Sequence, residues 1–163
     1  MNISRLLFLA IFIACTGLLG FGLYLEHGVG LEPCPLCVLQ RIAYIVVGLV
    51  ALVAAIHGPV RSFKYIYSGL ILITALAGAG IAGRQIWLQH LPPDQVPECG
   101  PGYDYLMEVF PLDEAIDMIF TGSGECAEIH WTFIGMSIAE WSFVMFVLIS
   151  VASVYAMLVK GKI

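Results

Sequence analysis

The sequence predicts an all-α membrane protein: a bundle of four transmembrane helices, with a long outer loop that carries a short surface helix. Of the 163 residues, 60% are hydrophobic, and the mean hydropathy of +0.94 is far above that of soluble globular proteins. Four stretches contain no Asp, Glu, Lys or Arg. Each is roughly long enough to cross about 30 Å of hydrocarbon as a helix, with some help from its flanks.

The four expected spans lie at about 6–25, 38–57, 65–87 and 141–159. The first follows Arg5 as a signal peptide would, but its apolar run is too long and no small-residue cleavage site follows it. We therefore expect this span to be retained. No internal repeat or polar linker divides the chain, so we expect one integral membrane domain over residues 1–163.

The basic residues indicate how the spans are oriented. Five of them fall near the ends of the chain or in the loop after the second span: Arg5, Arg61, Lys64, Lys160 and Lys162. Residues 88–139 contain no Lys or Arg at all. This positive-inside pattern predicts cytoplasmic termini and outer loops at about 26–37 and 88–140. The many acids of the second loop make nucleic acid an implausible partner.

The long outer loop begins with prolines and glycines that disfavour a helix. Further along, residues 111–120 place apolar and acidic side chains on opposite faces at helical spacing. This helix is too short to span, so we expect it to lie along the membrane surface or to pack on a partner protein. Trp87, Trp131 and Trp141 flank expected membrane boundaries, where tryptophan commonly anchors a protein.

The cysteines carry the chemical information. Cys15 lies within the first span, where we expect it to be buried and inert. Cys34, Cys37, Cys99 and Cys126 all fall on the outer side, where an oxidising compartment allows disulfide chemistry. Cys34 and Cys37 form a Cys-x-x-Cys motif, whose spacing lets two sulfurs bond across one turn and exchange with other thiols. Zinc ribbons use the same spacing, so the motif alone leaves both interpretations open.

The position of Cys37 favours redox chemistry. It lies where the second helix should begin, so the helix dipole and free N–H groups stabilise its thiolate. Arg41 follows one turn later on the same face, and its charge acts in the same direction. The alternative for Arg41 is an interfacial residue whose side chain reaches towards the headgroups.

Cys99 and Cys126 each lie in a break rich in glycine or proline. A disulfide between them would close a loop around the surface helix. It would be either a static staple worth roughly 3 to 4 kcal/mol or a transferable disulfide. Flexible residues on both sides favour the transferable disulfide.

Four motifs in this order resemble the disulfide bond formation protein B family. They are Glu-Pro-Cys-Pro-Leu-Cys-x3-Arg (32–41), Gly-Arg-Gln-x-Trp-Leu-Gln-His (83–90), Leu-Pro-Pro-Asp-Gln-Val-Pro-x-Cys-Gly-Pro (91–101) and Gly-Ser-Gly-Glu-Cys-Ala (122–127) with Trp131. The resemblance covers most of the chain. It implies a bacterial inner-membrane enzyme, a quinone-dependent thiol:disulfide oxidoreductase with its active cysteines in the periplasm. Its cofactor would be ubiquinone or menaquinone, and its partner a thioredoxin-like dithiol oxidase of the DsbA type.

Carried over to this sequence, the resemblance makes Cys34 and Cys37 the quinone-facing pair, and Cys99 and Cys126 the partner-facing pair. Arg41 would lie against the quinone together with Cys37. His90 matches loosely and either assists there or only hydrogen-bonds at the interface. Arg84 fits an ordinary anchor, and Glu26 has no role to carry over.

Two other classes of protein remain as alternatives. Four outer cysteines would also suit a zinc-binding membrane protein, although a second Cys-x-x-Cys is missing and we expect no metal. A quinone reductase resembling vitamin K epoxide reductase also places Cys-x-x-Cys beside a quinone. The order of motifs disfavours it, because here Cys-x-x-Cys precedes the second span and another pair lies in a late loop.

Overall fold

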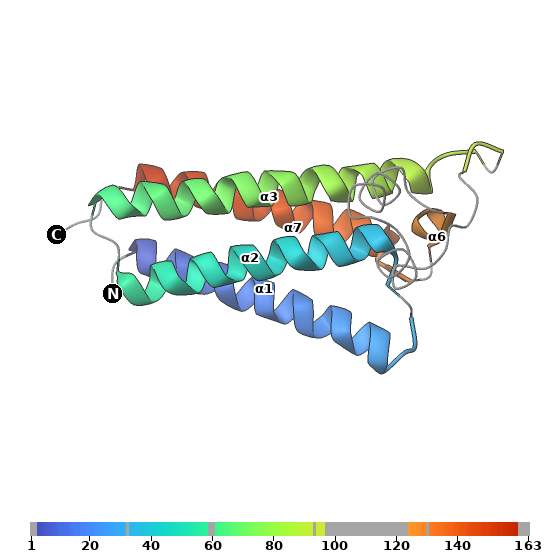
Figure 1. Cartoon of the computed structure of the whole chain (residues 1–163), viewed down its shortest axis with the longest axis horizontal. Helices are drawn as coiled ribbons and strands as arrows, with labels where there is room; N and C mark the ends of the chain where they lie inside the picture. Colours follow the sequence, from blue (N-terminus) through green and yellow to red (C-terminus); the bar gives the residue numbers. More distant parts are fainter. Residues whose placement is uncertain are drawn as a thin grey trace, which may run out of the picture.

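Four long helices form the protein. A computed structural model describes residues 3–31, 33–58, 61–92, 94–96, 124–129 and 131–159. The long helices are α1 (Ile3–His27), α2 (Pro35–His57), α3 (Arg61–Gln89) and α7 (Ile138–Leu158). They lie lengthwise beside one another, and α1 begins at the same end of the bundle at which α7 ends (Figure 1).

All four helices are long and apolar enough to cross a membrane. This confirms the prediction of four spans. Each begins about one turn before the apolar stretch expected from the sequence, because its first turn contains a charged residue or a proline that lies outside that stretch. The expected surface helix at 111–120 and most of the long outer loop lie outside the described residues.

Small side chains let the helices approach closely. Helix α2 packs between α1 and α3, and α3 packs along α7. The buried core contains many alanines, among them Ala51, Ala75 and Ala79. A Cβ on Gly78 of α3 would lie only 2.5 Å from the ring of Phe146 on α7. Close packing through small residues is the usual way in which membrane helices associate.

Polar groups tie the helices together at two depths. Within the bundle, Ser153 Oγ of α7 donates to the carbonyl oxygen of Ser68 of α3 at 2.6 Å. Near the chain ends, Arg5 Nε donates to the Ala55 carbonyl at 2.8 Å, and Lys64 Nζ donates to the Val159 carbonyl at 2.6 Å. Both cations therefore satisfy carbonyls at helix C-termini, where positive charge is favourable.

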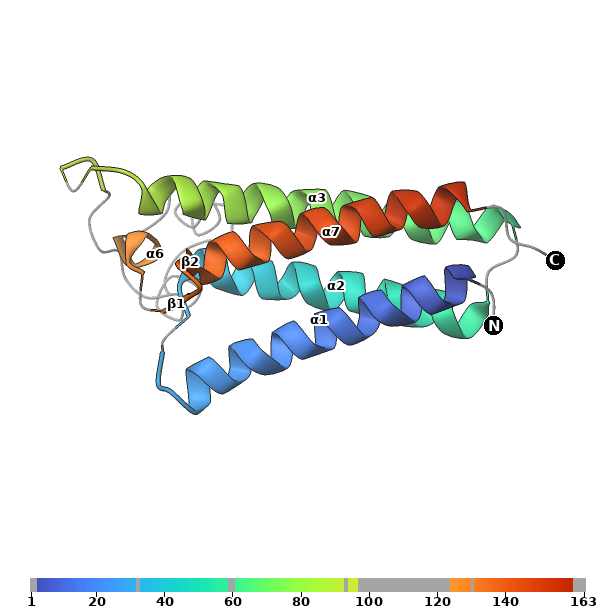
Figure 2. The same ribbon diagram turned by 180° about the vertical axis from the view of Figure 1, so that it is seen from behind.

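A short helix and a two-stranded hairpin lie at the opposite end of the bundle. Helix α6 (Gly124–Ala127) precedes β1 (Thr132–Phe133) and β2 (Met136–Ser137), which pair in antiparallel register. The two turn residues, Ile134 and Gly135, have φ values of 54° and 76°, as the tightest hairpin turns require. Helix α1 diverges from α7 towards this end (Figure 2).

Candidate active site: two cysteines facing an apolar cavity

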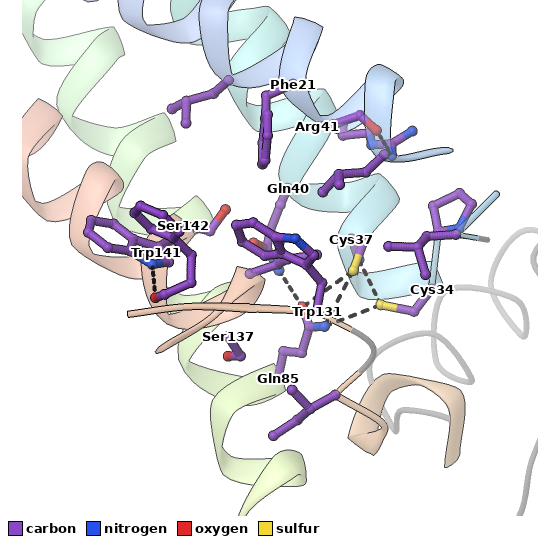
Figure 3. Close-up of a pocket in the computed structure, with 18 of the residues that line it drawn as sticks. Phe21, Cys34, Cys37, Gln40, Arg41, Gln85, Trp131, Ser137, Trp141 and Ser142 are labelled. Atoms are coloured by element: carbon purple, nitrogen blue, oxygen red, sulfur yellow. Dashed lines mark hydrogen bonds between the residues drawn. The ribbon is translucent and has the colours of Figure 1, made fainter. Parts of the chain in front are cut away.

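A cavity of about 770 Å³ lies among the four long helices and the hairpin. Its size falls in the range of small-molecule and cofactor sites. Most of its wall is aliphatic or aromatic, and polar groups are concentrated where α2 begins: Cys34, Cys37, Gln40, Arg41 and Gln85 (Figure 3). The cavity therefore suits a largely apolar ligand with a polar end.

The two sulfurs of the Cys-x-x-Cys motif lie at the start of α2. Cys34 is the N-cap residue, with an extended backbone, and Pro35 follows in the first turn, where it needs no hydrogen-bond donor. The Cys37 N–H donates to Cys34 Sγ at 3.3 Å, so the first sulfur replaces the usual oxygen of a helix cap. Both cysteines are thiols in the structure, and Cys37 faces the cavity.

Two buried glutamines connect these sulfurs to α3. Gln85 Nε2 donates to Cys34 Sγ and to Cys37 Sγ, each at 3.3 Å. Gln85 Oε1 accepts from Gln40 Nε2 at 2.7 Å, and each amide side chain belongs to a residue only 4% exposed. One amide of α3 therefore contacts both sulfurs of the Cys-x-x-Cys motif.

Cys126 brings a third sulfur to this place. It lies on α6 and is completely buried, in a cluster with Cys34, Leu36 and Leu88. A hydrogen bond with Cys126, another with Cys37, and burial together raise the pKa of the Cys34 thiol far above its ordinary range. Cys34 is thus held as a thiol beside two possible exchange partners. Cys99, the fourth expected site residue, lies outside the described residues.

Arg41 lies in the cavity wall one turn beyond Cys37. Its guanidinium forms an ion pair with Glu26 and donates to the carbonyl oxygen of Gly22 at 3.2 Å, so α1 supplies both of these partners. A side chain at position 22 would contact the guanidinium. Arg41 therefore lies beside the cavity. The hydrogen bonds to the two sulfurs come from Gln85.

A row of aromatic rings also lines the cavity. Phe21 of α1 meets Trp131 edge-on at a centroid distance of 5.4 Å, and Trp131 stacks on Phe133 at 6.0 Å. Phe133 lies 6.1 Å from Trp141 of α7, whose indole N–H donates to the Phe133 carbonyl. We call these four rings the aromatic row. Trp131 and Trp141, expected only as interfacial anchors, both line the cavity.

The remaining candidate residues lie elsewhere. His90 is exposed at the end of α3, where its Nδ1 donates to the Ile86 carbonyl at 2.8 Å; it is not among the described residues that line the cavity. Arg84 stacks on the ring of Trp87 at 4.2 Å. Cys15 is buried in the main core. The described part of the chain contains no group of His, Cys, Asp and Glu suited to a metal ion.

Sequence reasoning missed the two glutamines and the role of Glu26. One signal was available: Gln40 and Gln85 are amides inside otherwise apolar spans, and such residues usually face the bundle interior with a partner. Glu26 gave no comparable signal, because its partner Arg41 lies on another helix.

Comparison with known proteins assigns the family. The model of the family described as disulfide bond formation protein DsbB matches residues 4–156. A protein named disulfide bond formation protein B from Azoarcus sp. (strain BH72) is 54% identical over 142 residues, covering 87% of this chain and 85% of that protein. Its namesake from Aromatoleum aromaticum is 50% identical over 151 residues, covering 93% and 90%. The chain therefore belongs to the DsbB family of disulfide bond formation proteins.

Proposed function

We propose that this protein is a quinone-dependent thiol:disulfide oxidoreductase that reoxidises a thioredoxin-like dithiol oxidase of the DsbA type. The observation that carries the proposal is the placement of the Cys34 and Cys37 sulfurs beside a large apolar cavity that also holds the Arg41 guanidinium. A dithiol beside this cavity can exchange with other protein thiols, and it can also give electrons to an apolar acceptor bound in the cavity.

The thiol side of the reaction uses the late cysteine pair. The partner's thiolate attacks the Cys99–Cys126 disulfide at Cys99, and the partner's second thiol completes its own disulfide, leaving Cys99 and Cys126 reduced. Cys126 then exchanges with the Cys34–Cys37 disulfide through Cys34, the sulfur beside which it is buried. Two electrons thus reach Cys34 and Cys37, and Cys99 and Cys126 form their disulfide again.

The cavity residues fit a quinone. The aliphatic and aromatic wall suits an apolar ring, and the Arg41 guanidinium is a hydrogen-bond donor for a carbonyl oxygen. Ubiquinone or menaquinone, when bound, supplies an acceptor for two electrons and two protons. Cys34 and Cys37 close to a disulfide and release those electrons and protons, while Arg41 stabilises negative charge beside Cys37.

The same proposal places the protein in a bacterial inner membrane, with both termini cytoplasmic. Cys34, Cys37, Cys99 and Cys126 then face the periplasm, and the segment between α3 and α7 meets the partner. The absence of Lys and Arg between residues 88 and 139 supports this orientation. We keep His90 as a weaker candidate for assisting the quinone site.

The direct test is an electron-transfer assay with the purified protein. It is mixed with a reduced thioredoxin-like dithiol protein and a soluble quinone analogue, and the quinone absorbance is followed. We expect the absorbance to fall only when protein and dithiol are both present, and Cys37→Ser to abolish the change. Quinone reduction that continued at the wild-type rate in Cys37→Ser would refute the proposal.

The order of attack has its own test. In Cys126→Ser, a stable mixed disulfide should build up between Cys99 and the partner, because the resolving sulfur is missing. Non-reducing electrophoresis followed by peptide mapping detects it. If Cys99→Ser trapped the partner on Cys126 instead, and Cys126→Ser trapped nothing, the order of attack would be reversed.

A further inference from the structure

Gln85 is the residue whose contacts best explain how the Cys37 sulfur is held. Its Nε2 lies 3.3 Å from Cys37 Sγ and from Cys34 Sγ, while its Oε1 lies 3.7 Å from Cys37 Sγ. A thiol at Cys37 can therefore direct its hydrogen at the amide oxygen, and a thiolate can accept from the amide nitrogen. The Gln85 side chain can therefore form a hydrogen bond with Cys37 both as a thiol and as a thiolate.

The orientation of this amide is set by a second residue. Gln40, one residue before Arg41 on α2, donates to Gln85 Oε1 at 2.7 Å. In this arrangement the Gln85 oxygen accepts from Gln40, and the Gln85 nitrogen points at the sulfurs. In Figure 3 the dashed lines run from Gln40 to Gln85 and from Gln85 to both cysteines.

Among the described residues, few charged groups lie near this amide and Cys37. Cys34 and Cys126 are the neighbouring titratable sulfurs, and Arg41 is the nearby cation on the same helix. Glu26 of α1 forms an ion pair with that guanidinium, and Glu128 lies in the cavity wall. Helix α3 contributes only neutral amides to this wall, and α7 contributes neutral side chains.

We propose that the Gln85 amide stabilises the Cys37 thiolate during electron transfer, and that Gln40 is the positioning residue that fixes its orientation. This rests on the proposed dithiol chemistry and adds a hydrogen-bond donor to it. A buried amide donor is worth more to a thiolate than to a thiol, because the anion has lost its water and accepts the stronger hydrogen bond. Replacing the amide therefore penalises the thiolate selectively.

The test measures alkylation of the fully reduced protein, with mass spectrometry to separate Cys37 from the other cysteines. Gln85→Met keeps the length of the side chain but removes both N–H donors. We expect Cys37 alkylation at neutral pH to slow by about three- to tenfold, the equivalent of one net hydrogen bond. The rate at high pH should be unchanged, so that the pH profile moves to higher pH.

Two further variants separate this role from a merely structural one. Gln89→Met removes an amide one turn further along α3 that also lines the cavity but donates to neither sulfur in the contacts described, and its Cys37 profile should match the wild type. Gln40→Met should shift the profile less than Gln85→Met, and should add nothing in the double variant. An unchanged profile in Gln85→Met, or an equal shift in Gln89→Met, would overturn the proposal.

The outcome is independent of the proposed function, because alkylation needs neither quinone nor partner. If the profile shifts but no quinone is reduced, Gln85 still stabilises the thiolate and the electron acceptor is wrong. If quinone is reduced but the profile does not shift, the function stands and the role of Gln85 is wrong.

Discussion

At the scale of single residues, the Arg41 guanidinium is bonded to α1 and also faces the cavity. Glu26 and the Gly22 carbonyl already engage its guanidinium from α1, and its side chain is about one quarter exposed at the cavity wall. A guanidinium has five N–H donors in a rigid fork, so contacts to α1 leave other donors for a ligand. Glu26 thus fixes the position of Arg41 without using up its hydrogen-bonding capacity.

Arg41→Ala should weaken quinone use much more than reaction with the thiol partner. The loss of a hydrogen bond to a charged group, about 1.5 to 3 kcal/mol, corresponds to at least about a tenfold fall in kcat/KM for the quinone. Steady-state kinetics in which each substrate is varied in turn provide the measurement. Arg41→Lys keeps the charge but loses the planar fork of donors. Its kcat/KM for the quinone should therefore lie between the values for the wild type and for Arg41→Ala. If only the apparent KM for the partner changed, Arg41 would not act at the quinone site.

At the scale of elements, the contact between α3 and α7 depends on one missing side chain. Phe146 is fully buried against Gly78, and its ring stacks on Tyr44 at a centroid distance of 4.2 Å with the rings nearly parallel. Gly80, two residues along α3, has no atom within 4 Å of the position where its Cβ would be. The two glycines therefore differ in packing although they share a helix.

Gly78→Ala should destabilise the protein by about 1 to 3 kcal/mol, the usual penalty for overpacking a core. Gly80→Ala should leave the stability unchanged or raise it, because alanine is the better helix former. Thermal unfolding of both variants in the same detergent gives the comparison. Equal melting temperatures would show that the crossing of α3 and α7 relaxes around the new methyl group.

The elements also show which parts of the fold follow from sequence. The four spans depend on runs of apolar residues, a local property, and they are confirmed. The contacts of Gln85 with Cys37 and of Arg41 with Glu26 join residues 48 and 15 positions apart on different helices. They depend on how helices rotate against one another, which apolar periodicity leaves undetermined when side chains are apolar all round.

At the scale of the whole molecule, three of the cysteines lie at the opposite end of the bundle from the cations that cap helices. Arg5 and Lys64 are bonded to helix carbonyls at one end, and Cys34, Cys37 and Cys126 cluster at the other. The proposed orientation places these ends on the two sides of the membrane. It can be tested without reference to the chemistry.

In a background without native cysteines, Val29→Cys should react with a membrane-impermeant maleimide in intact spheroplasts, whereas His57→Cys should react only after permeabilisation. Both positions are exposed and lie at opposite ends of the bundle. Mass-tagging on a gel reads out both reactions. The reverse pattern would invert the predicted topology.

The aromatic row has an optical consequence. Trp131 and Trp141 both line the cavity, whereas Trp87 is half exposed on α3 and stacks with Arg84. An oxidised quinone is an electron acceptor that quenches nearby indole fluorescence. A quinone in the cavity should therefore quench Trp131 and Trp141 and leave the emission of Trp87 unchanged. Titration with a quinone analogue should therefore lower the emission to a plateau, and the fraction quenched should shrink in Trp131→Phe. The protein then carries its own reporter of cavity occupancy, without any attached dye.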